Sequence, residues 1–380
     1  MKILSVFGTR PEAVKMAPIV RRLKETAGIE SRVCVTAQHR QMLDQVLDLF
    51  QIKPDYDLDL MREDQSLAQI SASIFTHLDP VLTDFQPDWV LVVGDTTTVV
   101  TTSLLTYFRR IKLGHVEAGL RTHNKWHPFP EEINRRIATV IADLHFAPTE
   151  WSKGNLLCEG VAEDRILVTG NSVIDALDFV AKQDEPREIT ELLERLETRG
   201  PETRRLVLVT AHRRENFGQP LENICHALRQ LAARGDVEIV YPVHLNPNVQ
   251  EPVNRILKGA PHITLLPPLD YLPMVHLMKH AKLLLTDSGG LQEEAPSFGV
   301  PVLVLRETTE RPEGVEAGTL KVVGTETSHI LHMAERLLDD PAAYLEMAKA
   351  ANPYGDGHTA ERIVAALTSA YPAGTPPHRA

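Results

Sequence analysis

An anion-binding turn is predicted where the apolar run 283–285 gives way to Ser288, Gly289 and Gly290 and then to a helix-forming segment. Two consecutive glycines let the backbone approach a ligand because no Cβ stands in the way, and the unpaired N–H groups of a helix start point at an anion. Glu294, about one helical turn further on, could accept hydrogen bonds from a ribose diol. This pairing favours a nucleotide over bare phosphate, and an ordinary strand-to-helix turn is the alternative.

Three carboxylates stand at predicted strand ends or at a helix start. Asp95 follows the apolar run 89–93, Glu117 follows the run 112–116, and Glu131 opens a helix. Ligands of open α/β sheets sit outside the carboxyl ends of the strands, so we expect the three to gather at one site. Carboxylates that repel one another have raised pKa values, which suits general acid–base chemistry. Helix capping would explain each of them singly.

Basic residues also follow predicted strands. His212 stands at the end of the run 206–210, one residue beyond it, and is followed by Arg213, a pattern suited to a diphosphate, and His244 ends another run. Arg10 and Lys15 are expected to face an anion at the mouth of the first helix, although Lys15 fits a solvated helix position equally well. The local cations proposed to decide anion binding are Arg10, Lys15, Arg121, Arg135, Arg136, Arg213, Arg214 and Arg311.

Composition excludes several classes of protein. A formal net charge of −11 argues against a nucleic-acid-coating surface, and no apolar run approaches the ~20 residues of a membrane span. Cys34, Cys158 and Cys225 form no Cys-x-x-Cys pair, so neither a disulfide framework nor a metal site is predicted. Without a signal-peptide pattern the chain is expected to be cytoplasmic. The Gly-x-Gly-x-x-Gly, Walker and Gly-x-Ser-x-Gly sequences do not occur, which argues against NAD, kinase and hydrolase chemistry.

The elements that must position these residues alternate along the 380-residue chain, a length that suits two domains. The pattern predicts parallel sheets wound with helices, hence an α/β fold of two Rossmann-like domains facing a central cleft. Helices are predicted at 11–24, 40–50, 131–142, 150–158 and 359–371. Strands are predicted at 2–7, 32–36, 89–93, 112–116, 144–147, 166–168, 206–210, 238–243, 262–266, 283–286, 301–305 and 320–323.

Longer ordered motifs give the sequence a family resemblance. They are Phe-Gly-Thr-Arg-Pro-Glu-Ala at 7–13, Val-Thr-Ala-Gln-His-Arg at 35–40, Gly-Asp-Thr-Thr-Thr at 94–98, His-Val-Glu-Ala-Gly-Leu-Arg-Thr at 115–122, Pro-Glu-Glu-x-Asn-Arg at 130–135, His-Arg-Arg-Glu-Asn at 212–216 and Thr-Asp-Ser-Gly-Gly-x-Gln-Glu-Glu-Ala-Pro at 286–296. Together they resemble the non-hydrolysing UDP-N-acetylglucosamine 2-epimerases of bacteria over nearly the whole chain.

The resemblance implies a glycosyltransferase-B-like fold and a homodimer. The first domain is expected at 1–172 with a returning helix at 359–372, and the second, UDP-binding domain at 173–358. The implied reaction converts UDP-GlcNAc to UDP-ManNAc for cell-surface polysaccharide precursors. It proceeds through elimination of UDP, a 2-acetamidoglucal and re-addition, and it requires neither a metal nor a redox cofactor.

The resemblance also assigns residues. Asp95, Glu117 and Glu131 would act on the sugar. His212 would hold UDP and is also expected to be a catalytic residue. Leu269 and Met274 stand around the uracil, where relatives often carry other side chains. Gln38, Gln41, Arg213 and His244 would meet a second, activating UDP-GlcNAc. The remaining residues predicted to bind the UDP-sugar are Arg10, Lys15, Arg135, Ser288, Gly289, Gly290, Glu294 and Arg311.

Other activities fit the same residues. A glycosyltransferase using UDP-GlcNAc would need an acceptor groove and would form a new glycosidic bond. A hydrolytic relative would release free ManNAc, and a nucleotide-sugar sensor would turn nothing over.

Overall fold

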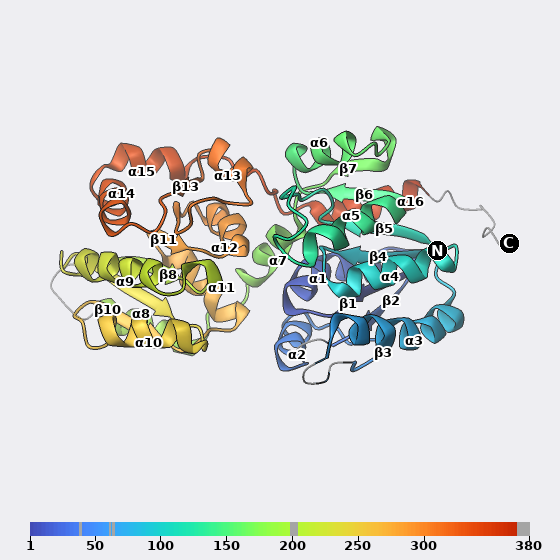
Figure 1. Ribbon diagram of the computed structural model, residues 1–380, viewed down its shortest axis with the longest axis horizontal. Helices are drawn as coiled ribbons and strands as arrows, with labels where there is room; N and C mark the ends of the chain where they lie inside the picture. The colour runs from blue at the N-terminus through green and yellow to red at the C-terminus, as the bar shows by residue number, and fades with distance from the viewer. Residues whose placement is uncertain (38–39, 61, 63–64, 198–203, 371–380) are drawn as a thin grey trace. The chain divides into compact units, whose positions relative to one another are not determined.

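The computed structural model describes residues 1–37, 40–60, 62, 65–197 and 204–370. The chain divides into two compact units, a first unit of Met1–Ala176 with Tyr354–Ala380 and a second unit of Leu177–Pro353. In Figure 1 the first unit is coloured from blue to green and also includes the red helix at the end of the described chain, and the second unit runs from green to red-orange. Among the described residues, no helix is both long and apolar enough to cross a membrane.

The sheet of the first unit is parallel, with the strand order β3-β2-β1-β4-β5-β6-β7. The order reverses between β1 and β4, so the loops after these two strands meet at the switch point where α/β sheets bind ligands. The strands are β1 (Lys2–Phe7), β2 (Glu30–Val35), β3 (Tyr56–Asp57), β4 (Trp89–Val93), β5 (Lys112–Val116), β6 (Leu144–Ala147) and β7 (Ile166–Val168).

The helices of the first unit include one that returns from the end of the chain. The red helix α16 packs against α1, and the Asp175 carboxylate accepts hydrogen bonds from Thr359 N at 3.2 Å and Ala360 N at 2.8 Å (Figure 1). The helices are α1 (Arg10–Glu25), α2 (Arg40–Leu49), α3 (Leu67–Phe85), α4 (Thr97–Phe108), α5 (Glu131–Ile141), α6 (Glu150–Cys158), η1 (Glu163–Arg165), α7 (Ser172–Val180) and α16 (Thr359–Ser369), with α7 running into the second unit.

The second unit repeats this plan with the strand order β10-β9-β8-β11-β12-β13, again parallel. Its switch point lies between β8 and β11, which brings the loop carrying His212 beside the turn carrying Ser288. The strands are β8 (Arg205–Thr210), β9 (Val237–Pro242), β10 (Ile263–Leu266), β11 (Leu283–Thr286), β12 (Val302–Val304) and β13 (Leu320–Val322).

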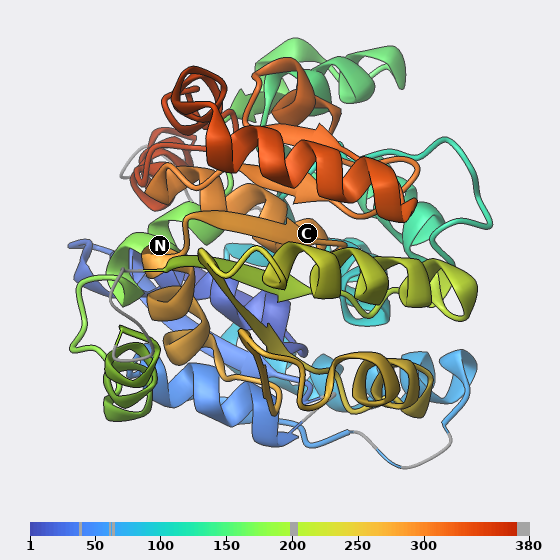
Figure 2. The same cartoon turned by 90° about the vertical axis from the view of Figure 1, so that its left-hand side faces the viewer.

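Helices α9, α10 and α14 cover the face of this sheet that is turned toward the viewer in Figure 2. Their apolar sides and the strands form one continuous core, in which Val207, Leu228 and Leu285 are fully buried. The helices are α8 (Arg187–Glu197), η2 (Arg214–Asn216), α9 (Gln219–Ala232), α10 (Pro247–Leu257), α11 (Tyr271–His280), α12 (Gly289–Glu294), η3 (Ala295–Phe298), α13 (Pro312–Glu316), α14 (Thr327–Asp339) and α15 (Pro341–Ala348).

The predicted α/β fold with two Rossmann-like units is confirmed, and several predicted strands have the same bounds as the observed ones. Strand β3 was not predicted, because two residues carry no alternation of apolar and polar positions. The last predicted helix, 359–371, ends at Ser369 in the structure, and residue 371 lies outside the described residues.

Candidate functional site

Glu117 is held in an unusual conformation at the end of β5. Its φ of +60° lies in the left-handed region, which costs a non-glycine residue about 1–3 kcal/mol and is typical of functional sites. The carboxylate is almost buried and forms an ion pair with Lys15, and Asn171 Nδ2 donates to Glu117 Oε1 at 3.0 Å. The other carboxylate oxygen faces the neighbouring turn, 3.4 Å from where a Cβ on Gly94 would stand.

Asp95 occupies that neighbouring turn and forms an ion pair with Arg135. The Arg135 Nε atom donates to Asp95 Oδ2 at 3.1 Å, and Asn134 Nδ2 donates to the backbone carbonyl of Asp95 at 2.9 Å. Thr96 caps α4 instead, because its side chain accepts the Val99 N–H. The Asp95 carboxylate, whose side chain is 25% exposed, is therefore not used as a helix cap.

We name the first cluster, Lys15, Asp95, Glu117, Arg135 and Asn171, the carboxylate site. The expectation that its acids repel one another is not what the structure shows, since Asp95 and Glu117 each pair with a cation. Glu131 starts α5 and, among the described residues, has no hydrogen-bond or ion-pair partner.

The N-terminus of α1 is occupied by the carboxylate of Glu12, which belongs to the same helix. Glu12 accepts hydrogen bonds from Gly8 N and Thr9 N, both at 2.8 Å, and from Thr96 Oγ1 at 2.5 Å. Burial raises the pKa of this carboxyl group. The amides predicted to receive an anion between Arg10 and Lys15 therefore already have an acceptor, while Arg10 is partly exposed and has no ion-pair partner among the described residues.

Two buried histidines lie behind the carboxylate site on paired positions of β5 and β6. Burial lowers the pKa of His115 to about 4 and the pKa of His145 to about 3. His115 is therefore neutral near pH 7. We assign the proton to Nε2, which lies 2.8 Å from the carbonyl oxygen of Gly94 and can donate to it. This bond fixes the turn that carries Asp95.

In the second unit a buried carboxylate organises the turn after β8. Asp287 Oδ2 accepts hydrogen bonds from the backbone N–H groups of His212 and Arg213, both at 2.8 Å, and from Asn216 Nδ2 at 3.0 Å. Asp287 is fully buried, and its Oδ1 lies 3.7 Å from His212 Nδ1. The positions of His212 and Arg213 are thus set by the residue that precedes Ser288.

Two guanidinium groups meet over the predicted anion-binding turn. The Nη2 atoms of Arg213 and Arg311 both lie 3.7 Å from where a Cβ on Gly289 would stand. Arg311 pairs with Glu293, whereas Arg213 Nε is buried without a hydrogen-bond partner among the described residues. We call His212, Arg213, Gly289 and Arg311 the arginine site. Two neighbouring guanidinium groups suit a ligand with several phosphate oxygens.

The remaining predicted residues are only partly brought together. His244, predicted for a second ligand, stacks on His212 with 5.2 Å between ring centroids and so lies against the arginine site. Arg213, predicted for the same ligand, is itself part of the arginine site. Glu294 ends α12, with Oε1 3.6 Å from where a Cβ on Gly290 would stand. Leu269 and Met274 are half-buried near the start of α11. Gln38 lies outside the described residues, and so does the side chain of Gln41.

Sequence reasoning missed several side chains that complete these clusters. Asn171 follows β7, so the rule that selected Asp95 and Glu117 could also have selected it. Asn134 and Asp287 act through backbone groups, and their sequence positions gave no sign of this.

Comparisons with known proteins agree over nearly the whole chain. A family model described as UDP-N-acetylglucosamine 2-epimerase matches residues 21–368. A relative of that name from Yersinia pestis is 56% identical over 371 residues, 97% of this chain and 98% of the relative. Another from Escherichia coli strain K12 is 55% identical over 372 residues, with 97% and 98% covered.

Solved structures are similar as well. UDP-GlcNAc 2-epimerase from Neisseria meningitidis bound to UDP-GlcNAc has 49% sequence identity and a TM-score of 0.88, covering 97% of this chain and 100% of that one. An S. aureus protein solved with UDP has 47% identity and a TM-score of 0.87, covering 97% and 96%.

The buried histidines predict a pH dependence of stability. Unfolding restores an ordinary histidine pKa of about 6.5, so the unfolded chain binds more protons below that pH. The free energy of unfolding should therefore be unaffected by these groups above pH 7 and fall as the pH drops from 6.5 toward 4. Each histidine should contribute a slope of up to about 1.4 kcal/mol per pH unit.

Urea titrations at pH 7, 6 and 5 would measure this slope by tryptophan fluorescence, because Trp89, Trp126 and Trp151 all belong to the first unit. The variant His145→Gln should show a shallower slope than the wild type. Equal slopes would show that His145 does not take up a proton on unfolding.

Proposed function

The chain belongs to the UDP-N-acetylglucosamine 2-epimerase family, an isomerase family, and we propose that it interconverts UDP-GlcNAc and UDP-ManNAc in the cytoplasm by inverting carbon 2 of the sugar. One observation carries the proposal for this chain. Asp95 and Glu117 lie on adjacent turns after β4 and β5, each held in place by a cation. Two positioned carboxylates are what proton removal from one face and proton return to the other require.

We assign the diphosphate of the substrate to the arginine site. Arg213 and Arg311 converge over Gly289, where the absence of a side chain leaves room for a ligand near the backbone. Guanidinium groups bind phosphate oxygens through paired hydrogen bonds, and a buried Asp287 keeps the turn carrying Arg213 fixed. A solved relative from S. aureus contains UDP, which supports a uridine nucleotide as the ligand.

The chemistry of carbon 2 favours elimination and re-addition. Its hydrogen has no adjacent carbonyl group, so direct deprotonation would leave a carbanion without an enolate to stabilise it. If the bond between carbon 1 and the phosphate oxygen breaks, its electron pair leaves with UDP and carbon 1 becomes electron-deficient. A carboxylate then takes the proton from carbon 2, and the electrons of that bond form the double bond of 2-acetamidoglucal.

The reverse steps complete the epimerisation. A proton is delivered to carbon 2 from the opposite face, and the phosphate oxygen of UDP attacks carbon 1 again. In this scheme the arginine site stabilises the departing diphosphate and retains it, while Asp95, Glu117 and Glu131 handle the proton. The product UDP-ManNAc would enter the synthesis of cell-surface polysaccharide precursors.

A second UDP-GlcNAc is also part of the proposal, with Gln38, Gln41, Arg213 and His244 as its predicted contacts. The stacked rings of His244 and His212 support direct communication between such a ligand and the diphosphate. Arg213, which lies as near to Gly289 as Arg311 does, is better assigned to the substrate diphosphate.

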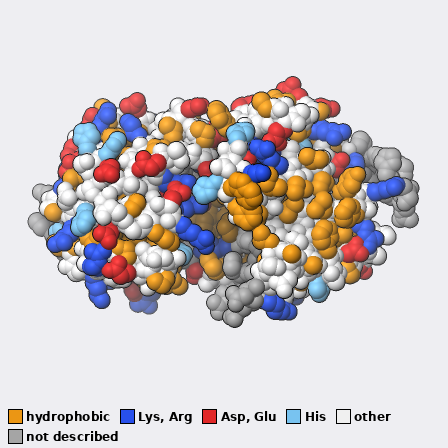
Figure 3. All heavy atoms as spheres, viewed as in Figure 1, with side chains coloured by type: hydrophobic (Ala, Val, Ile, Leu, Met, Phe, Trp, Pro, Cys, Tyr) orange, Lys and Arg blue, Asp and Glu red, His pale blue; other side chains and the backbone are white. Residues whose placement is uncertain are grey.

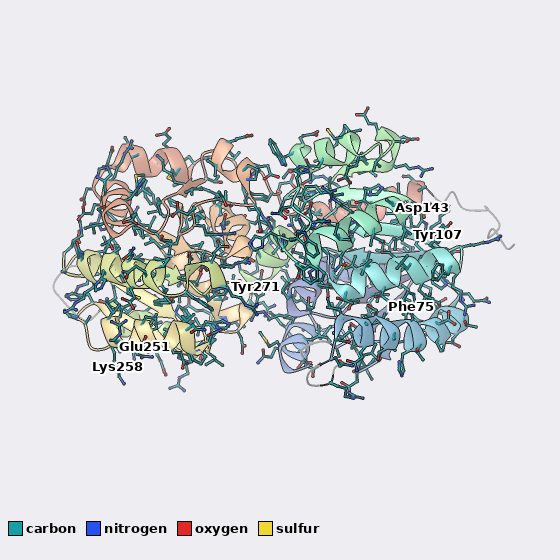
Figure 4. All side chains as sticks on the ribbon, in the orientation of Figure 1. Phe75, Tyr107, Asp143, Glu251, Lys258 and Tyr271 are labelled. Atoms are coloured by element: carbon teal, nitrogen blue, oxygen red, sulfur yellow. The ribbon has the colours of Figure 1, made fainter. Side chains whose placement is uncertain are left out.

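We expect a homodimer formed through the first unit. Helix α4 contains no charged residue from Thr97 to Phe108, yet Tyr107 and Phe108 are about two-thirds exposed. Figure 3 shows apolar side chains gathered over α4 and its neighbours, and Figure 4 labels Phe75 of α3 and Tyr107 of α4, two helices that contact each other. Phe75 stacks on Phe108, and Val140 of α5 is 87% exposed. A second copy of the same uncharged face is the occupant we propose.

The carboxylate variants give the central prediction for the reaction. In deuterium oxide the wild-type protein should convert UDP-GlcNAc to UDP-ManNAc carrying deuterium at carbon 2, as followed by proton NMR. Asp95→Asn and Glu117→Gln should lose at least about 100-fold in exchange rate, since each removes a proton-transfer group, but should still bind UDP. Glu150→Gln, at an exposed carboxylate that starts α6, is the matched control.

Other products would contradict the proposal in distinct ways. Free ManNAc would indicate a hydrolytic enzyme, a new glycoside a glycosyltransferase, and unchanged substrate a sensor. If epimer formed without positional exchange of an isotope in the bridging oxygen, the elimination step would be wrong.

Removal of either guanidinium group tests the diphosphate site. Arg213→Ala and Arg311→Ala should each weaken UDP binding by about 10- to 100-fold, the value of a charge-assisted hydrogen-bond pair. Arg214→Ala is a close control because Arg214 is exposed and has no ion-pair partner among the described residues. Calorimetry would measure the three dissociation constants, and equal values for Arg213→Ala and Arg214→Ala would remove Arg213 from the site.

The dimer prediction concerns the uncharged face of α4. Tyr107→Glu combined with Phe108→Asp should convert the protein to a monomer in analytical ultracentrifugation, because a charge buried in an interface is costly. Leu345→Asp places a charge on an exposed leucine of α15 in the second unit and should leave the mass unchanged. A monomeric wild type would refute the assignment.

A further inference from the structure

The structure assigns to Glu132 the role of a positioning residue for Asp95, an inference that rests on the proposed function. Glu132 is the second residue of α5 and is fully buried, although it is charged. A buried carboxylate is costly unless its oxygens are satisfied, so its partners indicate what it does.

One set of partners leads to Asp95. The Nη1 atom of Arg135 lies 3.3 Å from Glu132 Oε2, while the other edge of the same guanidinium, Nε and Nη2, donates to Asp95 Oδ2. The guanidinium is planar, so anchoring Nη1 fixes the direction in which its opposite edge points. Arg135 itself is 9% exposed, and Glu132 thus determines how it meets Asp95.

The other set of partners leads toward Glu117. Glu132 Oε2 accepts the backbone N–H of Thr122 at 3.0 Å, and Oε1 accepts that of His123 at 3.1 Å. These residues belong to the segment that leaves β5 after Glu117, and His123 has a left-handed φ of +61°. One side chain therefore ties the segment after Glu117 to the partner of Asp95.

The neighbouring Glu131 has a different environment. Successive helical residues point about 100° apart, so only one of two adjacent glutamates can face the interior. Glu131 is half-exposed and available to a ligand, whereas Glu132 is enclosed by protein groups. The pair divides into a residue that can contact substrate and one that cannot.

The same ion-pair network offers a matched control. Arg136 Nη2 lies 3.4 Å from Glu132 Oε1, and its Nε lies 3.8 Å from Glu159. Glu159 also receives two hydrogen bonds from the buried Arg121, both at 2.8 Å. Glu159 is therefore a structural carboxylate of the same network that does not contact Arg135 or Asp95.

Glu132→Gln and Glu159→Gln should be compared with the wild type in the deuterium-exchange assay. A glutamine keeps one acceptor oxygen but presents an NH2 group, which cannot accept from a guanidinium or a second N–H. We expect kcat of Glu132→Gln to fall about 10- to 100-fold, the range known for the loss of a hydrogen-bond partner that orients a metal-binding side chain. The KM and the affinity for UDP should change less than about threefold, since the diphosphate contacts are untouched. Glu159→Gln should keep kcat within about twofold of the wild-type value, while its loss of thermal stability should be similar to that of Glu132→Gln.

A second measurement does not depend on activity. With 15N-labelled arginine, the Arg135 Nε–H signal, assigned by its loss in Arg135→Lys, should be protected from solvent exchange in the wild type and in Glu159→Gln. It should lose that protection in Glu132→Gln. A wild type without epimerase activity would refute the proposed function but would leave this measurement valid. Full kcat in Glu132→Gln, an equal loss in Glu159→Gln, or an unchanged Arg135 signal would overturn the role of Glu132.

Discussion

Buried carboxylates that accept pairs of backbone N–H groups are the constraint on which both sites depend. Loops at the carboxyl ends of parallel strands leave N–H groups without strand partners, and an unsatisfied buried N–H costs about 1–3 kcal/mol. Glu12 accepts hydrogen bonds from the backbone N–H groups of the loop after β1. Glu132 does the same for the segment after β5, and Asp287 for the turn after β8. The hydrogen bonds from these N–H groups hold each carboxylate in place. The carboxylate in turn fixes the backbone that carries a candidate functional side chain. Side chains on these loops can therefore be held in defined positions, although loops are usually more mobile than helices and strands.

The two Rossmann-like units of this glycosyltransferase-B-like fold share one topology but carry different kinds of site residues. In both, the strand order reverses beside the first strand of the unit. The candidate site residues follow β4 and β5 in the first unit and β8, β11 and β12 in the second. The first unit places carboxylates there and pairs them with Lys15 and Arg135, whereas the second places Arg213 and Arg311 over a glycine. The proposed proton-transfer region and the proposed anion-binding region thus use the same backbone plan with different residues in the loops.

The strand pattern and the strand-end rule were enough to predict the fold class and to select Asp95, Glu117, His212 and Ser288. They could not predict the partners. Whether a carboxylate faces another carboxylate or a cation depends on side chains far away in sequence, such as Lys15 for Glu117, which are 102 residues apart. Nor could adjacent glutamates be told apart, because the choice between Glu131 and Glu132 depends on the rotation of α5 about its own axis. Short-range patterns determine elements, whereas the electrostatics of a site depend on long-range contacts.

The return of α16 to the first unit has a consequence for biosynthesis. Ile363, Val364 and Leu367 are buried in a unit whose other parts precede the second unit along the chain. A ribosome adding roughly 5–20 residues per second needs on the order of 10–35 s to pass from Ala176 to Tyr354. During that interval the surface of α1 that α16 will cover is bare, and the last residue of the inserted unit, Pro353, is added before α16 is made. The first unit is therefore synthesised first but completed last, because its final helix is made after the second unit.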